Sequence, residues 1–274
     1  MKKRRRGPVE TPGLDVLGPL QEIIRQVRTG DLTVAHLQSF TTHRNPFARA
    51  ETTKPPLEVA HPLTIADAVS ILGERKVLTV AQAAKAQGRE APEDTPIRWG
   101  EEVLREHAEA NRRGGTDWRL AYVFGTSLRE SCEKFGTDRN RQPCFYDGST
   151  WWFKSAEDRW AKFRPEGRYY LVDLIGRFGL TDWSQQEEEI TKLGPRFRRC
   201  HEAVVTEAAF SIFKTTGERM LETWWHWGQS LDSLGGRVGV GGFGPGGWFV
   251  GGSRPVWDWS GRLRACLEEV PSES

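Results

Sequence analysis

The sequence predicts an α+β protein, in which a helical N-terminal half precedes a half that mixes helices and strands. Up to Gly114–Gly115, apolar residues recur with helical spacing, and Pro and Gly residues separate the segments. Beyond that point, runs rich in aromatic and β-branched residues appear for the first time, at Trp118–Gly125 and Tyr169–Ile175. We therefore expect three parts: a basic tail over residues 1–13, a helical region over 14–113 and an α+β domain over 118–274.

Composition limits the classes of function. Hydrophobic residues make up 37% of the 274 residues and charged residues 28%, which is typical of a globular protein. Five of the basic residues lie at positions 2–6, and without these five the chain carries 34 basic and 37 acidic residues. A body of this charge is not a general nucleic-acid binder. Only the tail offers a weak nucleic-acid contact, through Lys2, Lys3, Arg4, Arg5 and Arg6.

Nothing in the sequence predicts a membrane protein or a secreted one. No apolar run approaches the roughly 18 residues that a membrane helix needs. The basic start is followed by GPVETPG rather than by the apolar core of a signal peptide. The four cysteines (Cys132, Cys144, Cys200 and Cys266) are scattered and form no CxxC pair. We therefore expect a reduced, cytoplasmic protein.

The first half contains a series of short helices. Helical spacing is present over residues 14–28, over a shorter stretch that reaches Phe40, and from Thr64 onward, where Ile65, Ala68, Val69 and Leu72 share one face that Gly73 ends. Residues 52–62 carry three prolines and are typical of a linker. A further charged helix is expected over Trp99–Arg112.

The segment Leu78–Gly88 (LTVAQAAKAQG), with Thr79 as its cap, is similar to the first helix of a helix-turn-helix unit. That unit needs a recognition helix directly after the turn, whereas Arg89–Pro96 brings two prolines and three acidic residues. A small packing helix is therefore the alternative interpretation.

The second half is expected to alternate helices and strands. A capping box at Ser127 predicts a helix that ends at Phe135, and one at Ser184 predicts a helix that ends at Gly194. Asp147–Gly148, between aromatic runs, predicts a hairpin over Cys144–Phe153. The apolar run Tyr169–Ile175 predicts a central strand, in one sheet with the hairpin and the C-terminal strands. The remaining expected elements are helices over Arg196–Lys214 and Glu218–Thr223 and strands over Arg237–Val240, Gly247–Val250 and Arg262–Val270.

Several patterns suggest chemistry without the context that the chemistry needs. Gly239–Gly244 matches GxGxxG, but Pro245 and glycines follow where a dinucleotide site needs a helix. His201 begins an HExxH-like stretch, but Val205 replaces the second His, so we expect His201 to be buried on the packed face of the long helix without a metal. His226, between Trp225 and Trp227, is the best acid–base candidate, yet no carboxylate is fixed beside it, and a structural histidine is the alternative. We assign no catalytic residue, metal or cofactor, and whether the protein is an enzyme stays open.

The stretch Thr223–Val250 concentrates Trp and Gly, a composition that suits a recognition surface or a tightly turned sheet edge. Downstream, Trp257-Asp258-Trp259 follows a Gly-rich segment. We expect Trp248, Trp257 and Trp259 to lie together with at least two rings partly exposed, because Pro255 and Ser260-Gly261 leave only a short strand to bury them. The predicted ligand-binding residues are Trp248, Arg254, Trp257, Asp258 and Trp259. The alternative is that these rings cover the sheet.

Six stretches carry a resemblance. One is LTVAHLQSFTTHRNPF at Leu32–Phe47, and the other five, within Tyr169–Val250, are YYLVDLIGRF, SQQEEEITKLG, RCHEAVVTEAAFSIF, ERMLETWWHWG and GGRVGVGGFGPGGWFV. Through them, a third to half of the chain resembles a family of uncharacterised bacterial proteins, which transfers no activity. The C-terminal part is similar to the variable tails of retroelement-diversified proteins, which implies a C-type-lectin-like fold that binds ligands. Two features depart from that pattern: the tail is poor in Asn and Tyr, and the last strand carries Glu268 and Glu269.

Taken together, these observations predict a protein that binds an unidentified protein or small-molecule ligand through its Gly/Trp-rich C-terminal surface. Two alternatives remain. One is a DNA-associated protein that uses the basic tail and Leu78–Gly88, and the other is an enzyme centred on His226.

Overall fold

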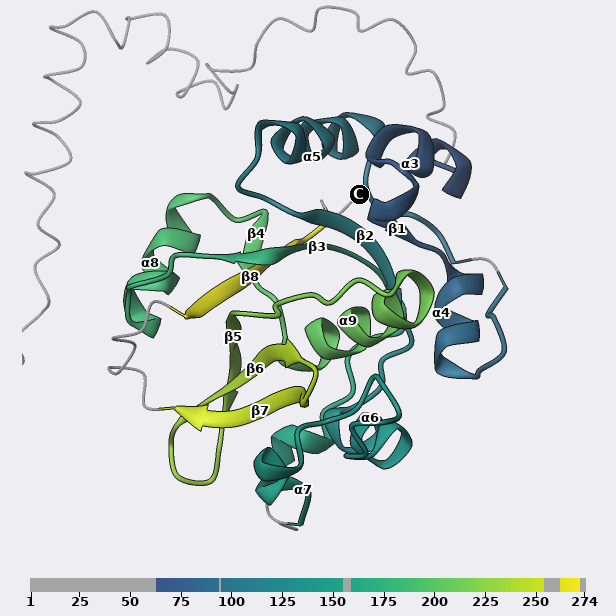
Figure 1. Ribbon diagram of the computed structural model, residues 1–274. Coiled ribbons are helices and arrows are strands. Elements are labelled where there is room, and N and C mark those ends of the chain that lie inside the picture. The colour runs from purple at the N-terminus through teal and green to yellow at the C-terminus, as the bar shows by residue number, and fades with distance from the viewer. Residues whose placement is uncertain (1–62, 94, 155–158, 254–261, 272–274) are drawn as a thin grey trace, which may run out of the picture. The chain divides into compact units, whose positions relative to one another are not determined.

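The computed structural model describes residues 63–93, 95–154, 159–253 and 262–271, which belong to one compact unit (Figure 1). The architecture is α+β, with helices and a mixed sheet, as the sequence predicted. The expected tail, the helices before residue 52 and the linker lie outside the described residues. So do four of the five predicted ligand-binding residues: Arg254, Trp257, Asp258 and Trp259.

The described chain begins with three α-helices, one short 3-10 helix and a short strand: α3 (Ile65–Leu72), η1 (Glu74–Lys76), β1 (Val77–Leu78), α4 (Val80–Gln87) and α5 (Glu101–Arg113). Capping boxes at Thr64 and Thr79 fix the starts of α3 and α4, and the cap at Thr79 was expected. Helix α3 packs against α5, whereas α4 packs against α9 and β2 and buries Ala83 and Ala84. Helix α4 is thus a packing helix in a core that it shares with the second half of the chain.

One eight-stranded sheet organises the unit, in the order β1-β2-β3-β8-β5-β6-β7, with β4 paired to β8. Its longer strands are β2 (Trp118–Val123), β3 (Arg168–Arg177), β4 (Phe197–Arg199), β5 (Trp225–Leu231), β6 (Arg237–Gly244), β7 (Gly247–Ser253) and β8 (Leu263–Glu269). Strand β3 is antiparallel to both β2 and β8, and most of it is buried. This confirms that the Tyr169 strand is central and pairs with a C-terminal strand.

Strand β8 joins two parts of the sheet. Its second half lies between β3 and β4, where Glu269 pairs with both Leu171 and Phe197. Its first residues, Leu263 and Arg264, pair in parallel with Trp225 and His226 of β5. From there β5, β6 and β7 continue as an antiparallel meander. The meander is therefore tied to the central sheet through a single strand.

The remaining helices are α6 (Leu128–Phe135), η2 (Asp147–Ser149), α7 (Trp151–Lys154), η3 (Arg159–Lys162), α8 (Trp183–Lys192) and α9 (Glu202–Thr216). The capping box at Ser127 starts α6, as predicted. The N-cap of α8 lies two residues before the expected Ser184, because Asp182 and Gln185 form the capping box instead.

Three predicted elements were wrong. No hairpin forms at Asp147–Gly148: Tyr146 donates its N–H to Trp248 O, and Ser149 folds back onto Tyr146 O in the turn of η2. The long helix does not begin near Arg196, because residues 197–199 pair with β8 as β4. Residues 218–223 form turns rather than a helix. In each case a long-range main-chain pairing or a tight turn overrode the local pattern.

The core surrounds α9, which lies between the β2–β3 part of the sheet and the β5–β6–β7 meander (Figure 1). Every residue from Glu202 to Ile212 is buried. Its polar side chains bond to the surrounding elements: Thr206 accepts from the Trp248 indole, and Glu207 accepts the N–H groups of Phe124 and Thr126. Because a buried polar group without a partner is destabilising, these bonds allow a helix with acidic residues to be buried on all sides.

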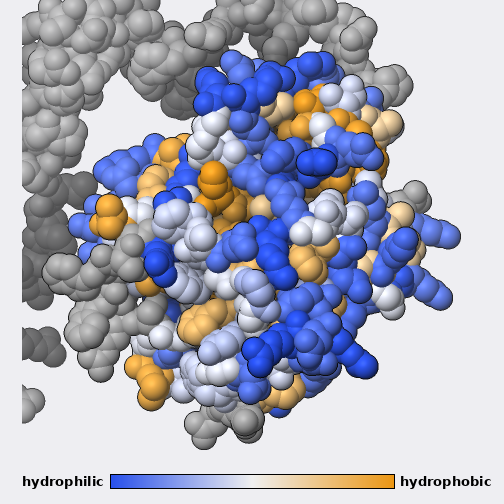
Figure 2. Space-filling model, viewed as in Figure 1, coloured by the Kyte–Doolittle hydropathy of each residue, from blue (hydrophilic) through white to orange (hydrophobic). Residues whose placement is uncertain are grey.

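The described surface is mostly hydrophilic in the view of Figure 2, with hydrophobic groups gathered near α3. Within the described ranges, no helix combines the length and the apolar character that a membrane crossing requires.

Candidate functional site

The meander β5–β6–β7 presents two faces with different chemistry. Alternate residues of a strand point to opposite faces, so residues in register share a face. Trp225, Gly241 and Phe249 form one row across the three strands, and His226, Val240 and Val250 form the next row, on the other face. The second row is fully buried, whereas Trp225 is partly exposed and Phe249 is 37% exposed. The first row therefore belongs to the outer face.

Trp248 lies on the inner face, which corrects its prediction as a ligand-binding residue. Its side chain is 0% exposed, its indole N–H donates to Thr206 Oγ1 over 3.1 Å, and its ring meets those of Phe210 and Phe243 edge-on. Trp248 is buried because alternate residues of β7 point to opposite faces: Trp248 shares the inner face with Val250, whereas Phe249 points outward. Trp248 is thus a core residue without access to a partner.

Three aromatic rings meet on the outer side, and we call Tyr146, Trp225 and Phe249 the aromatic patch. The Phe249 ring is stacked on Tyr146 with 6.4 Å between centroids, and it meets Trp225 at 6.1 Å in a T-shaped contact. Tyr146 is 48% exposed. The exposed Arg262 places its guanidinium 5.8 Å from the Trp225 ring. The patch joins rings from a loop and two strands that are up to about a hundred positions apart in the sequence.

Glycines beside these rings leave the space that the rings occupy. A Cβ at Gly242, whose φ is +58°, would lie 2.6 Å from Trp225 Nε1. A Cβ at Gly251 would lie 2.6 Å from the Phe249 ring. Real Cβ atoms do not approach other atoms so closely, so any larger residue would displace a ring. The Gly-rich composition that the sequence shows here therefore lets aromatic rings lie against the sheet backbone.

A polar groove adjoins the patch at Tyr146, and we call it the Asp147 groove. It is open to solvent and has a volume of about 610 Å³. Its lining residues are Thr137, Asp138, Arg139, Asn140, Tyr146, Asp147, Gly148 and Gly246. Tyr146 belongs to both features, so an apolar surface and a hydrogen-bonding surface are continuous on this side of the molecule.

His226 occupies the inner face and contacts only the protein. Its Nε2–H donates to Cys200 O over 2.7 Å, and its Nδ1 accepts from Cys266 N over 3.0 Å. The side chain is fully buried, and this burial lowers the pKa of His226 to about 3. Both ring nitrogens are used by main-chain groups, and neither reaches solvent. His226 is therefore a neutral link between β5, β8 and the start of α9, the structural alternative that the sequence left open.

His201 lies at the start of α9 rather than on its packed face, which corrects the prediction. It is the N-cap, and its Nδ1 accepts the Ala203 N–H over 3.1 Å. Its side chain is 14% exposed and stacks on Phe163 with 4.2 Å between centroids, and burial lowers its pKa. Its Nε2 lies 3.6 Å from Oε1 of Glu202. Among the described residues, no group of three or more His, Cys, Asp or Glu side chains could hold a metal.

Comparisons of the chain with models of protein families, with curated proteins and with solved structures found no match. The resemblance to uncharacterised bacterial proteins and to C-type-lectin-like domains therefore stays a prediction.

Proposed function

We propose that this chain is a binding protein that contacts a protein partner through the aromatic patch and the adjoining Asp147 groove. The observation that carries the proposal is the gathering of Tyr146 and Phe249, both more than a third exposed, against Trp225. Exposed rings in contact with one another are typical of the centres of protein interfaces, where Trp and Tyr contribute much of the binding energy.

The shape of the surface favours a protein partner over a small molecule. Small-molecule sites enclose most of the ligand surface. Here the rings lie on the outer face of a sheet, and the adjoining groove is open to solvent. An apolar centre beside a polar margin, with Asp138, Asn140 and Asp147 as hydrogen-bonding groups, is the usual anatomy of a protein–protein interface. The segment 254–261, with Arg254, Trp257, Asp258 and Trp259, directly follows β7 in the chain, and its part in binding stays a prediction.

A display experiment tests the proposal and works even though the partner is unidentified. Wild-type protein is used to select binders from a random-peptide phage library. The same selection is run on a Tyr146→Ser/Phe249→Ser variant and on a control variant, Leu180→Ser/Leu234→Ser. The control changes two leucines that are 76% and 89% exposed and lie outside the patch. Thermal unfolding of all three proteins checks that they are equally folded.

We expect the wild type and the control to enrich the same peptides and the patch variant to lose them. Replacement of exposed rings changes stability by about 1 kcal/mol or less, so a loss of binding at an unchanged melting temperature assigns the effect to the surface. Peptides that bind the patch variant as well as they bind the wild type, or a selection that enriches nothing, would contradict the proposal.

A further inference from the structure

A second groove opens beside the C-terminal end of α9, and we call it the Arg119 groove. Its outer part has a volume of about 570 Å³ and is lined by Glu74, Arg75, Gln82, Thr215, Thr216, Gly217 and Glu218. A narrower inner cavity of about 20 Å³ continues it toward Lys76, Arg119 and Ile212. The groove thus leads from solvent to a buried guanidinium group. It shares no lining residue with the aromatic patch.

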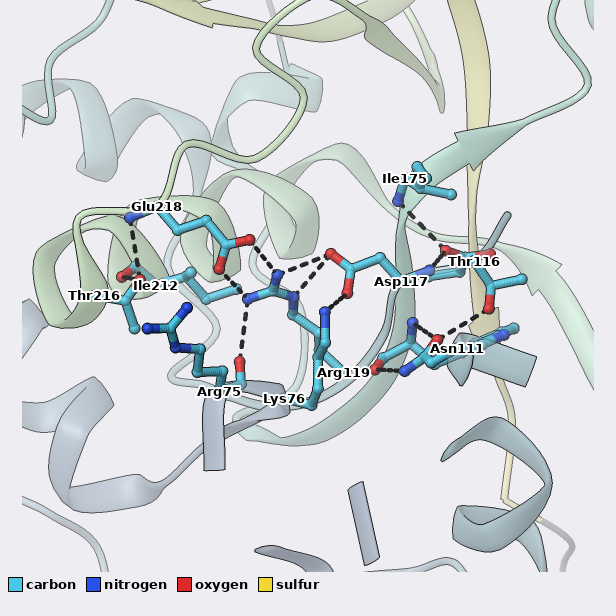
Figure 3. A network of polar contacts seen from close by, with 12 residues as sticks. Arg75, Lys76, Asn111, Thr116, Asp117, Arg119, Ile175, Ile212, Thr216 and Glu218 are labelled. Atoms are coloured by element: carbon cyan, nitrogen blue, oxygen red, sulfur yellow. Dashed lines mark hydrogen bonds and ion pairs between the residues drawn. The ribbon is translucent and has the colours of Figure 1, made fainter. Parts of the chain in front are cut away.

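Arg119, in β2, is 2% exposed, and its five N–H groups all have acceptors (Figure 3). Glu218 binds it as a fork: NH1 donates to Oε2 over 2.9 Å and NH2 to Oε1 over 2.7 Å. Nε and NH2 also donate to Asp117 Oδ2, and NH1 donates to Arg75 O. A planar guanidinium with two parallel bonds to one carboxylate is the strongest way in which arginine recognises an anion.

The two carboxylates on Arg119 differ in how firmly they are held. The Asp117 side chain is 13% exposed and also pairs with Lys76. The Glu218 side chain is 41% exposed and stands in the groove wall, directly after Gly217, the residue that ends α9. A rotation about its side-chain bonds would carry the Glu218 carboxylate into solvent without unfolding an element. Asp117 is therefore the permanent counter-ion of Arg119, and Glu218 is the exchangeable one.

Once Glu218 leaves, three basic side chains around the groove (Arg75, Lys76 and Arg119) face two carboxylates, those of Asp117 and Glu74, so the groove carries excess positive charge. Arg119 and Lys76 would then share the single carboxylate of Asp117. The groove also holds Arg75, whose side chain has no hydrogen bond or ion pair within the described part of the chain. An anion that fitted the groove would meet the fork of Arg119 at one end and the Arg75 guanidinium nearer the opening.

We propose that the Arg119 groove is a binding site for a small organic acid, whose carboxylate takes the place of the Glu218 carboxylate on Arg119. Glu218 itself defines the ligand chemistry, because its carboxylate occupies the fork in the planar, two-bonded geometry. The outer groove is open to solvent, as the Asp147 groove is, and the buried fork at its inner end is what distinguishes it. Glu218 then acts as an internal competitor. The apparent affinity of the wild type for the ligand is therefore reduced by the fraction of molecules in which Glu218 has left Arg119.

The experiment compares organic acids of increasing size on wild-type protein and on Glu218→Gln. The amide fills nearly the same volume but has no negative charge, so the variant frees the fork without opening a hole. Succinate, acetate and inorganic phosphate are titrated at constant ionic strength, and binding is followed through the Arg119 Nε–H signal in NMR spectra. Arg75→Ala provides a second variant with an altered groove.

Glu187→Gln is the matched control. Glu187 is 38% exposed and pairs with Arg199, which is also 2% exposed, but through one bond, from Nε to Oε1, rather than a fork. We expect Glu218→Gln to bind succinate about tenfold or more tightly than the wild type, and Glu187→Gln to bind it as the wild type does. Arg75→Ala should weaken succinate binding more than acetate binding, because acetate reaches only the inner end.

Three results would overturn the proposal. One is a succinate affinity that is the same in Glu218→Gln and in the wild type. Another is an equal gain in Glu187→Gln, which would indicate a general effect of a lost surface charge. The third is phosphate binding that exceeds succinate binding in all proteins, which would assign the groove to phosphate esters instead.

Discussion

The inner and outer faces of the meander β5–β6–β7 both carry aromatic residues, which are buried in the core on the inner face and partly exposed on the outer face. Trp248 and Phe249 are neighbours in β7, yet Trp248 is fully buried and Phe249 is 37% exposed. The inner face packs against α9, and its rows carry Val238, Val240 and Val250 between the rings. The outer face has Gly239, Gly241 and Gly251 at the matching places. Within β7, an aromatic residue is therefore buried or exposed according to strand parity, not according to its type.

Trp248→Ala should show the largest difference in stability between substitutions on the two faces. Truncation of a core Trp leaves a cavity beside Phe210 and Phe243 and leaves Thr206 without its indole partner. We expect a loss of roughly 3–5 kcal/mol in the free energy of unfolding, measured by urea denaturation. Phe249→Ala should lose about 1 kcal/mol or less, because its ring is already partly in water. Equal losses would show that the two faces are equally packed.

Substitution of Gly241 or Gly251 by alanine should destabilise the protein to different extents. Gly241 has φ +140°, and its Cβ would meet the main-chain oxygen of Trp224, which cannot move without shifting the strand. We expect Gly241→Ala to destabilise by roughly 2–3 kcal/mol. At Gly251 the new Cβ would meet only the Phe249 ring, whose exposed side allows it to turn away, so the loss should stay below about 1 kcal/mol. A reversal of this order in thermal unfolding would contradict the described register.

The inner face should also respond to pH through His226. Burial lowers the pKa of His226 to about 3 in the folded state, whereas the unfolded chain takes up this proton below a pH of about 6.5. The stabilisation is therefore complete above pH 6.5 and decreases as the pH falls toward 3, by about 1.4 kcal/mol per pH unit. His226→Gln should flatten the slope of unfolding free energy between pH 6.5 and 5 by about one proton. An unchanged slope would mean that another group causes the acid sensitivity.

Trp225→Phe should have the smallest effect on stability. The indole N–H of Trp225 is buried and has no hydrogen-bond partner among the described residues. Phenylalanine removes this unpaired donor but also some contact area, and the two effects oppose each other. We expect a net change within about 0.5 kcal/mol by chemical denaturation. A loss of several kcal/mol would show that Trp225 packs as a core residue and would remove it from the aromatic patch.

Local signals predicted the parts of the fold that local chemistry decides. The caps at Thr64, Thr79 and Ser127 set the starts of three helices, because a side-chain bond to a backbone N–H three residues later is a local event. The start of α9 and the fold of Cys144–Phe153 depended on pairing with β8 and β7, which local spacing does not contain. Likewise, Glu268 and Glu269 in the last strand are buried, because Arg168, Arg198, His107 and Arg196 pair with them from elements distant in the sequence.

The exposed rings of the proposed site are not the residues that the sequence selected. The stretch around Trp225 was singled out for its Trp and Gly content, yet Trp248 was chosen where Phe249 is exposed. The alternation of residues along the strand could have identified the exposed ring. Trp248 lies on the same face as the apolar Val250, whereas Phe249 lies on the same face as Gly247 and Gly251. Tyr146 had no such signal, because its stacking on Phe249 joins segments about a hundred residues apart.

The enclosure of α9 has a consequence for how the chain is made. This helix is buried along most of its length and gains one side of its cover from β5 and β6, which follow it in the chain. Those strands are anchored by β8, which follows them in turn. During synthesis, α9 therefore leaves the ribosome before the meander side of its cover exists, although α4, β2 and α6 are already available to pack on its other side. A nascent chain that stops between Thr216 and Leu263 would expose this helix, and contacts of such long sequence separation form slowly. Chaperone binding and aggregation should thus concentrate in this interval of translation and end once β8 has paired with β3.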